Sequence, residues 1–99
     1  MYIVASIWEV ARGKKAEAEA LGKTMRARLI AQSGVEAIQH YTTDGNEDEI
    51  MVIVSYTDEA AYNRIINDPN GPFQTALKDV ALESMMTWKQ SWRGTAAPE

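Results

Sequence analysis

Apolar residues recur along this chain with a period of two in some segments and with a helical period in others. Residues 2–10 and 50–56 are rich in β-branched and aromatic types and predict two strands. Alternate positions are apolar on both faces of these two strands, so we expect each to be covered on both sides. Residues 35–43 alternate less cleanly and predict a third strand. Residues 84–93 predict a fourth, with the larger side chains of one face at Met86, Trp88 and Trp92.

Helical spacing dominates the stretches between these strands. Residues 14 to about 32 consist largely of strong helix formers, and Gly34 suits the left-handed residue that ends such a helix. The apolar stripe of this helix is Ala18, Leu21, Met25 and Leu29. A second helical region begins with Thr57 as its expected N-cap and is interrupted by the Pro and Gly of residues 67–72. Its inward positions are Ala61, Tyr62, Ile65 and Ile66 before the interruption, and Phe73, Ala76, Leu77 and Val80 after it.

The order of these elements is β-α-β-β-α-β, with Asp44 and Gly45 as a hairpin turn lengthened by the polar residues 46–49. This order predicts an α+β, ferredoxin-like fold, in which both helices cover one face of a four-stranded antiparallel sheet. The first and third strands lie in the middle, in agreement with their two apolar faces. We expect one domain over residues 1–94 and a frayed tail over residues 95–99.

The helices of such a fold leave the other sheet face bare. Apolar side chains of the central strands on that face would form a patch larger than an ordinary monomer exposes. A second copy packed sheet to sheet across a twofold axis would bury this patch. We therefore expect a homodimer formed through the sheet face.

Composition and charge narrow the partners further. The chain has 99 residues, a formal net charge of −4 and no cysteine, so disulfides, thiolate catalysis and cysteine-ligated metals are excluded. No lysine or arginine lies between Arg28 and Arg64, and this acidic middle argues against a nucleic-acid partner. We expect no membrane span and no signal peptide, and hence a cytoplasmic location.

Nearly the whole chain resembles the dimeric α/β-barrel superfamily. Five segments carry the resemblance: IVASIWEV, the Ala/Glu/Lys-rich helix, VEAIQHYTT after Gly34, EIMVIVSY and TDEAAYNRII. The step from Tyr56 through Asp58 and Glu59 to Ala60 resembles members of the antibiotic-biosynthesis-monooxygenase type. The resemblance implies a homodimer with a small cavity between sheet and helices in each subunit. Members include cofactor-independent oxygenases of aromatic polyketides, haem-degrading enzymes, muconolactone isomerases and stress-response proteins, so the fold does not fix the function.

Five side chains are our candidates for the lining of that cavity. Trp8, Tyr56, Tyr62 and Trp88 would form flat, partly polar walls for an aromatic ligand, although all four are also typical core or interface residues. His40, the single histidine, and Tyr62 are the candidate catalytic groups. A strand histidine that merely bonds locally or faces solvent is the alternative interpretation of His40.

Two functions stay open on the sequence alone. One is a dimeric module that binds a small aromatic or apolar molecule without catalysis, since no acid–base pair or nucleophile set stands at a recognisable spacing. The other is a cofactor-independent monooxygenase of a planar aromatic substrate, in which the protein supplies orientation and electrostatics. Haem degradation would lean on an Asn–Trp–His set, and the first strand carries no asparagine. We expect no metal site and no bound cofactor.

Overall fold

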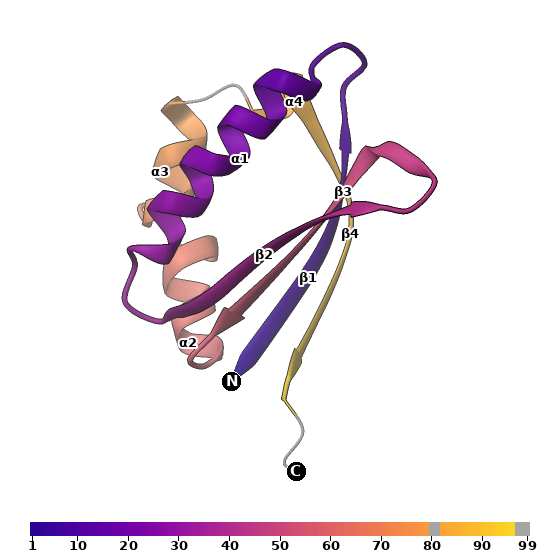
Figure 1. Cartoon of the computed structure of the whole chain (residues 1–99). Coiled ribbons are helices and arrows are strands. Elements are labelled where there is room, and N and C mark those ends of the chain that lie inside the picture. Colours follow the sequence, from indigo (N-terminus) through magenta and orange to yellow (C-terminus); the bar gives the residue numbers. More distant parts are fainter. Residues whose placement is uncertain (80–81, 97–99) are drawn as a thin grey trace.

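One antiparallel sheet of four strands, in the order β2-β3-β1-β4, carries its helices on one side (Figure 1). The computed structural model describes residues 1–79 and 82–96, and their side chains except those of 76–79 and 82–83. The elements in chain order are β1 (Tyr2–Val10), α1 (Lys15–Ile30), β2 (Val35–Thr43), β3 (Asn46–Tyr56), α2 (Glu59–Tyr62), the π-helical turn η1 (Asn63–Asn67), α3 (Pro72–Asp79), α4 (Leu82–Met85) and β4 (Met86–Thr95). The predicted α+β, ferredoxin-like architecture is confirmed, with β1 and β3 in the middle of the sheet.

The register of the central strands explains their two apolar faces. Val4 stands opposite Val54 on the face under the helices, where Val54 is buried. Ala5 stands opposite Ile53 on the other face, which no helix covers in Figure 1. Because side chains alternate along a strand, this register assigns every second residue of β1 and β3 to the bare face. Both faces of the two central strands are therefore apolar, as the sequence predicts.

Helix α1 packs onto the sheet through the predicted stripe of Ala18, Leu21, Met25 and Leu29, all of which are buried. Gly34 has the predicted positive φ, at +104°, but it does not cap α1, whose C-cap is Ala31. The reason for a glycine lies elsewhere: a Cβ at this position would stand only 2.8 Å from the Cβ of Ala61. Gly34 thus lets the loop before β2 lie directly against α2.

The second helical region differs from the sequence prediction in its start and in its winding. Asp58, not Thr57, is the N-cap, because its Oδ1 accepts a hydrogen bond from the Ala61 backbone N–H at 2.8 Å. After Tyr62 the chain widens into the π-helical turn η1, where Ile65 is fully buried. All four inward residues predicted for this segment do face the core or pocket. The predicted stripe of α3 is described only at Phe73, since the side chains of residues 76–80 lie outside the described part.

Three predicted boundaries are corrected by the structure. The hairpin turn is Asp44–Gly45 alone, because Thr43 pairs with Asn46 and the polar residues 46–49 belong to β3. The segment 84–85 belongs to α4, so β4 begins at Met86. At its other end β4 includes Thr95, and the Ala96 backbone N–H donates to the Met1 carbonyl at 2.9 Å. Residues 97–99 of the expected frayed tail lie outside the described residues.

Two hydrophobic clusters fill the layer between sheet and helices. The larger cluster lies under α2 and η1, and its buried members are Tyr2, Leu29, Ile38, Val54, Tyr56, Ala61, Tyr62 and Ile65. The smaller one has two buried members, Leu21 and Met25, with partly buried Trp8, Met85 and Met86 packed against them. Phe73 of α3 contacts both clusters. The second cluster is the looser of the two, and the pocket opens beside it.

Candidate functional site

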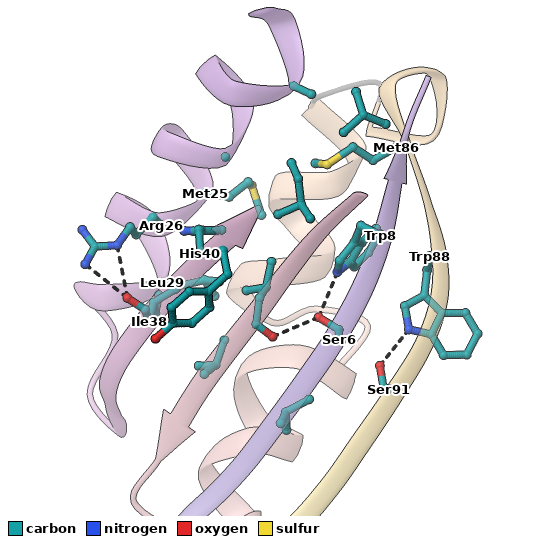
Figure 2. A pocket seen from close by; sticks show the side chains of 18 of the residues that line it. Ser6, Trp8, Met25, Arg26, Leu29, Ile38, His40, Met86, Trp88 and Ser91 are labelled. Atoms are coloured by element: carbon teal, nitrogen blue, oxygen red, sulfur yellow. Dashed lines mark hydrogen bonds between the residues drawn. The ribbon is translucent and has the colours of Figure 1, made fainter. Parts of the chain in front are cut away.

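A pocket of about 930 Å³ lies between α1 and the sheet (Figure 2). Its size falls within the range of small-molecule binding sites in proteins. The floor comes from residues of all four strands, and the walls come from α1 and from single residues of the later helices. Most of the floor is apolar, formed by Val4, Trp8, Val10, Ile38, Ile50, Val52, Val54 and Met86. The cavity predicted between sheet and helices is therefore present in a single subunit.

Trp8 presents its indole to this pocket from the centre of the sheet. Its Nε1–H donates to Ser6 Oγ at 2.9 Å, which satisfies the one polar atom of the ring. Ser6 is itself buried, and its hydroxyl reaches the Val52 carbonyl at 3.5 Å. Ser6, on the same face of β1, thus orients the indole through this one hydrogen bond (Figure 2). Trp8 lies where the sequence analysis placed it, as one flat wall of the pocket.

Trp88 stands opposite Trp8 on the neighbouring strand, but it lies only at the rim of the pocket. Its side chain is 56% exposed, and its Nε1–H donates to Ser91 Oγ at 2.7 Å at the outer side of β4 (Figure 2). The prediction that Trp88 and Trp92 share a face is wrong. The pairing shifts between Ile7 and Trp8, so that Trp88 lies on the pocket face while Trp92, opposite Ala5, lies on the bare face.

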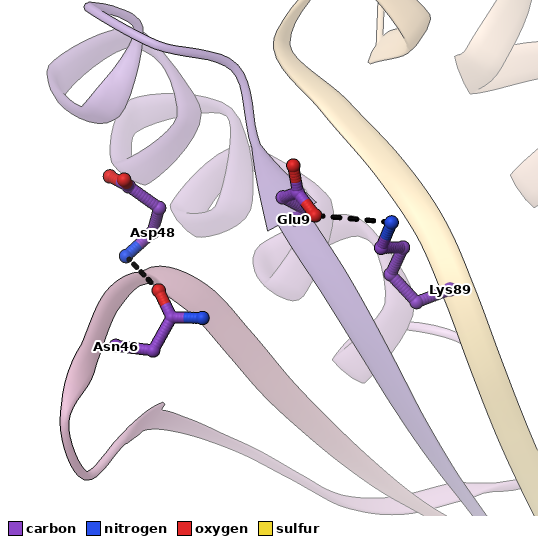
Figure 3. A network of polar contacts seen from close by, with 4 residues as sticks. All are labelled: Glu9, Asn46, Asp48 and Lys89. Carbon is purple, nitrogen blue, oxygen red and sulfur yellow. Dashed lines mark hydrogen bonds and ion pairs between the residues drawn. The ribbon is translucent and has the colours of Figure 1, made fainter.

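Lys89 is the residue that the shifted pairing leaves between Trp88 and Gln90. An extra residue of this kind is a β-bulge, which bends a strand and redirects the side chains that follow it. Lys89 Nζ forms an ion pair with Glu9 Oε2 of β1 at 3.1 Å (Figure 3). Both side chains are about half exposed, so the pair contributes little to stability. The ion pair links β1 and β4 directly at the bulge.

Three tyrosine rings and one arginine close the end of the pocket under α2. The Tyr62 ring lies 5.5 Å from the Tyr2 ring and 5.4 Å from the Tyr56 ring, measured between centroids. The Arg93 guanidinium stands 5.5 Å from the centroid of Tyr62, in the position of a cation–π contact. Tyr56 and Tyr62 are buried, and both line the pocket. The structure therefore brings both tyrosine candidates together at one end.

The surroundings of Arg93 at this end favour its charged form beside the Tyr62 ring. A side-chain hydrogen bond with Tyr62, followed by the charges of Tyr62, Tyr2 and Glu59, raises the pKa of Arg93 above its usual value. Burial is the main cause that raises the pKa of Tyr56, with the neighbouring Tyr62 adding to it. Both groups accordingly keep their protons at neutral pH. A guanidinium next to the Tyr62 hydroxyl is suited to stabilise an anion.

His40 lies on β2 at the opposite mouth of the pocket, between that strand and α1. It is exposed, and it lies opposite Val52 on the pocket face. One side of the ring nevertheless packs against the protein, and this partial burial is the first cause that lowers the pKa of His40; the positive charge of Arg26 is the second. The imidazole is therefore neutral at pH 7 and able to accept a proton. The structure places His40 at the pocket, as the functional hypothesis requires, and not at the tyrosine end.

Arg26 bridges the two sides of this mouth. Its Nε and Nη2 donate to the Ile38 carbonyl at 3.4 and 3.2 Å (Figure 2). A side chain of α1 is thus tied to the backbone of the edge strand β2. Lys15, Glu19 and Lys23 of α1 continue the charged rim, so the mouth is polar while the floor is apolar.

Neither a metal centre nor the asparagine set of a haem-degrading site is assembled in the described part of the chain. No three His, Asp or Glu side chains there are grouped to hold a metal ion. Asn63 and Asn67 are exposed and bonded to each other, with Nδ2 of Asn67 donating to Oδ1 of Asn63 at 2.9 Å. Ser6 occupies the middle of the β1 pocket face, where no asparagine is present. No helix within the described ranges has both the length and the apolar character needed to cross a membrane.

Sequence reasoning missed Arg93 and the anchoring roles of Ser6 and Arg26. Simple alternation from Trp88 places Arg93 on the face away from the helices, and only the bulge at Lys89 reverses this. No residue type in residues 86–95 signals that bulge. Ser6 did carry a signal, since it is the one polar residue on a strand face that otherwise reads Tyr2, Val4, Trp8 and Val10.

Comparisons with known proteins agree with this geometry. SnoaB, a cofactor-independent oxygenase from Streptomyces nogalater, matches 99% of this chain and 94% of its own, with a TM-score of 0.80 at 20% identity. Another antibiotic biosynthesis monooxygenase matches 99% of this chain and 100% of its own, with a TM-score of 0.79 at 12% identity. A variant of MhuD, crystallised with two manganese protoporphyrin IX groups per active site, matches 100% of this chain and 97% of its own, with a TM-score of 0.77 at 15% identity.

These structural likenesses, all at low identity, establish the fold. A search of the curated proteins gives no significant match. The family model for antibiotic biosynthesis monooxygenases matches residues 1–69, which span β1 through η1 and so include most of the pocket floor. The chain therefore belongs to the antibiotic biosynthesis monooxygenase family.

Proposed function

We propose that this protein binds a planar phenolic aromatic molecule in the pocket between sheet and helices and oxygenates it without a cofactor. One observation carries the proposal: an apolar pocket of about 930 Å³ is walled by Trp8 and ends at the Tyr62–Arg93 pair. Aromatic rings stack on such a wall, and a phenol oxygen finds donors at such an end. SnoaB, which shares this fold, is a cofactor-independent oxygenase, and this supports the same class of reaction for this chain.

The chemistry asks little of the protein beyond forming and holding an anion. At one mouth the neutral imidazole of His40 takes a proton from a ring carbon of the substrate, while the substrate's phenol oxygen lies at the tyrosine end. The resulting anion passes one electron to dioxygen, and the substrate radical and superoxide combine into a peroxide. This peroxide takes the proton back and loses water, which leaves the quinone. Tyr62 and Arg93 stabilise the negative charge as it develops. Trp8 fixes the plane of the rings, so that substrate and groups meet in one orientation. Non-catalytic binding of the same class of molecule is the alternative, and it needs only the pocket and Trp8.

Oxygen uptake with 1,8-dihydroxy-9-anthrone tests the proposal. One anthrone and one dioxygen give one 1,8-dihydroxyanthraquinone and one water, so absorbance and an oxygen electrode report the same event. We expect uptake well above the autoxidation background, and a loss of about tenfold or more in kcat for Tyr62→Phe and for His40→Gln. Ala20→Ser, on the exposed side of α1 and away from both sheet faces, is the control and should keep full activity.

Two results separate the alternatives. Tryptophan quenching by 1,8-dihydroxyanthraquinone without any catalysed oxygen uptake would support non-catalytic binding and contradict the oxygenase function. Absence of both binding and uptake, with this anthrone and with a panel of hydroquinones, would remove the proposed function altogether. Haemin is included as a further ligand, because MhuD shares the fold with a bound porphyrin.

We also propose that the protein is a homodimer joined through the bare sheet face. That face carries Ile3, Ile7, Met51 and Ile53 from the central strands, and Trp92, which is 52% exposed. Partly exposed apolar residues beside a half-exposed tryptophan are typical of an interface between copies. Sedimentation should give a dimer at micromolar concentration, and Ile53→Glu should give a folded monomer, whereas Glu36→Lys on the exposed part of β2 should not. A stable, folded wild-type monomer would contradict this proposal.

A further inference from the structure

Gly22, in the middle of α1, is the one helical glycine of this chain that neither backbone conformation nor packing explains. Its φ is not positive, in contrast to Gly13, Gly34 and Gly45. A Cβ built at Gly22 would meet no atom within 4 Å, whereas one at Gly34 would collide with Ala61. Glycine in a helix interior is less stable than alanine because it loses more backbone entropy on folding. The helix therefore carries a cost at Gly22 that no contact offsets.

The position of Gly22 on α1 suggests what the missing side chain leaves open. Ala18 and Arg26, one turn before and one turn after it, both line the pocket, and so does Gly22 itself. At 3.6 residues per turn, Gly22 lies between the buried stripe that contains Met25 and the charged rim that contains Glu19. A side chain here would enter the mouth between α1 and β2.

Arg26 bounds the open space at Gly22 on one side. Its guanidinium is tied to the Ile38 carbonyl and so closes the mouth on one side of Gly22. The open space at Gly22 is the neighbouring part of the same mouth, toward the N-terminal half of α1. This space gives a ligand longer than the apolar floor room to extend past α1.

We propose that Gly22 is a specificity-determining residue, whose missing side chain admits aromatic ligands of three or more fused rings. This inference rests on the proposed function, since it concerns the same pocket. Two-ring ligands lie deeper, against Trp8, and do not reach Gly22. The residue acts through space alone, so its effect grows with the volume of any side chain placed there.

Binding of two probes of different length tests the inference. The probes are 1-naphthol, with two rings, and 1,8-dihydroxyanthraquinone, with three, both measured by quenching of tryptophan fluorescence. Gly22→Leu and Gly22→Phe should weaken the three-ring probe about tenfold or more and the two-ring probe less than about twofold, with Gly22→Ala between them and wild type. Ala20→Leu and Ala20→Phe, on the opposite, exposed side of α1, should change neither.

The absence of cysteine gives a second, independent measurement. Gly22→Cys introduces a single thiol, whose reaction with Ellman's reagent should be slowed by the three-ring probe and not by 1-naphthol. The thiol of Ala20→Cys should react at the same rate with and without either probe. These reaction rates need no assumption about turnover.

The outcomes distinguish failure of this inference from failure of the proposed function. Wild-type binding of both probes, with equal loss or no loss in the Gly22 variants, would overturn the inference and leave the proposed function standing. Failure of wild type to bind either probe would overturn both. If circular dichroism shows that Gly22→Phe is unfolded, Gly22→Ala and Gly22→Cys provide the test, because alanine and cysteine both favour a helix more than glycine does.

Discussion

The two ends of the layer between sheet and helices are built from similar residues but packed differently. Under α2 and η1, eight buried residues form one cluster, in which Tyr56 and Ile65 are almost fully enclosed. At the other end, the second cluster has just two buried members among the described residues, Leu21 and Met25, and the pocket lies beside it with buried Val10 and Ala18 in its lining. Stability is therefore concentrated at one end, which leaves the other free to hold a ligand without a collapsed core.

The tyrosine rings belong to both ends at once. Tyr62 packs against Tyr2 and Tyr56 in the dense cluster, yet it also faces the pocket, next to Arg93. A group that must hold its orientation gains from rigid neighbours on one side and open space on the other. The candidate site is thus formed where the densely packed cluster borders the pocket.

The largest expected effect comes from a cavity at the packed end. Ile65→Ala should lower the free energy of unfolding by about 3–5 kcal/mol, because Ile65 is fully buried and its neighbours cannot collapse freely. Met25→Ala, beside the existing pocket, should cost clearly less, since part of the deleted volume already borders empty space. Guanidinium denaturation of the two variants measures both values. An equal or larger loss for Met25→Ala would remove the proposed difference between the ends.

A smaller effect is expected from backbone strain at the same packed end. Gly34→Ala should cost about 1–3 kcal/mol, because φ is +104° and the new Cβ would stand 2.8 Å from Ala61 Cβ. Arg64 Nη2, which donates to the Ser33 carbonyl at 2.8 Å, would also have to move. Thermal unfolding followed by circular dichroism gives the comparison with wild type. Unchanged stability would mean that the loop before β2 can withdraw from α2 at no cost.

The fold could be predicted from the sequence because its signals are local and repeated. Alternation on β1 and β3 and the stripe of α1 each involve several residues, so one misleading position does not change the outcome. Boundaries failed where two local signals compete. Thr57 and Asp58 are both good N-caps, and the polar residues 46–49 suit a loop as well as an exposed strand.

The site was only partly predictable, because it depends on one irregularity. Trp8, Tyr56 and Tyr62 follow from strand and helix periodicity, and the structure places all three at the pocket. Arg93 does not, since its face depends on the extra residue at Lys89. A bulge is decided by how two strands pair, and pairing energies are spread over residues far apart in the sequence.

An effect of opposite sign is expected at the open end. Gly22→Ala should raise the free energy of unfolding by about 0.5–1 kcal/mol, because alanine favours a helix interior and its Cβ meets no atom within 4 Å. The same substitution that destabilises the packed end at Gly34 thus stabilises the open end. Paired denaturation curves of Gly22→Ala, Gly34→Ala and wild type show this directly. A loss of stability in Gly22→Ala would reveal packing at that position and would weaken its role as an open gap.

The smallest effect concerns protonation at the mouth of the pocket. The folded-state pKa of His40 lies below its ordinary value of 6.5, because burial and then the charge of Arg26 disfavour the cation. Above that value both folded and unfolded chains hold a neutral ring, so stability is unaffected there. As pH falls through 6.5, the unfolded chain binds the proton first, and wild type loses stability until the folded pKa is reached. The ring is exposed, so solvent screening keeps this loss below about 0.5 kcal/mol. His40→Gln should show a shallower decline between pH 7 and pH 5.5 in guanidinium denaturation, because the carboxylates titrate alike in both proteins. Parallel curves would mean that burial and Arg26 do not lower the pKa of His40. A steeper decline in the variant would mean that the folded protein raises this pKa.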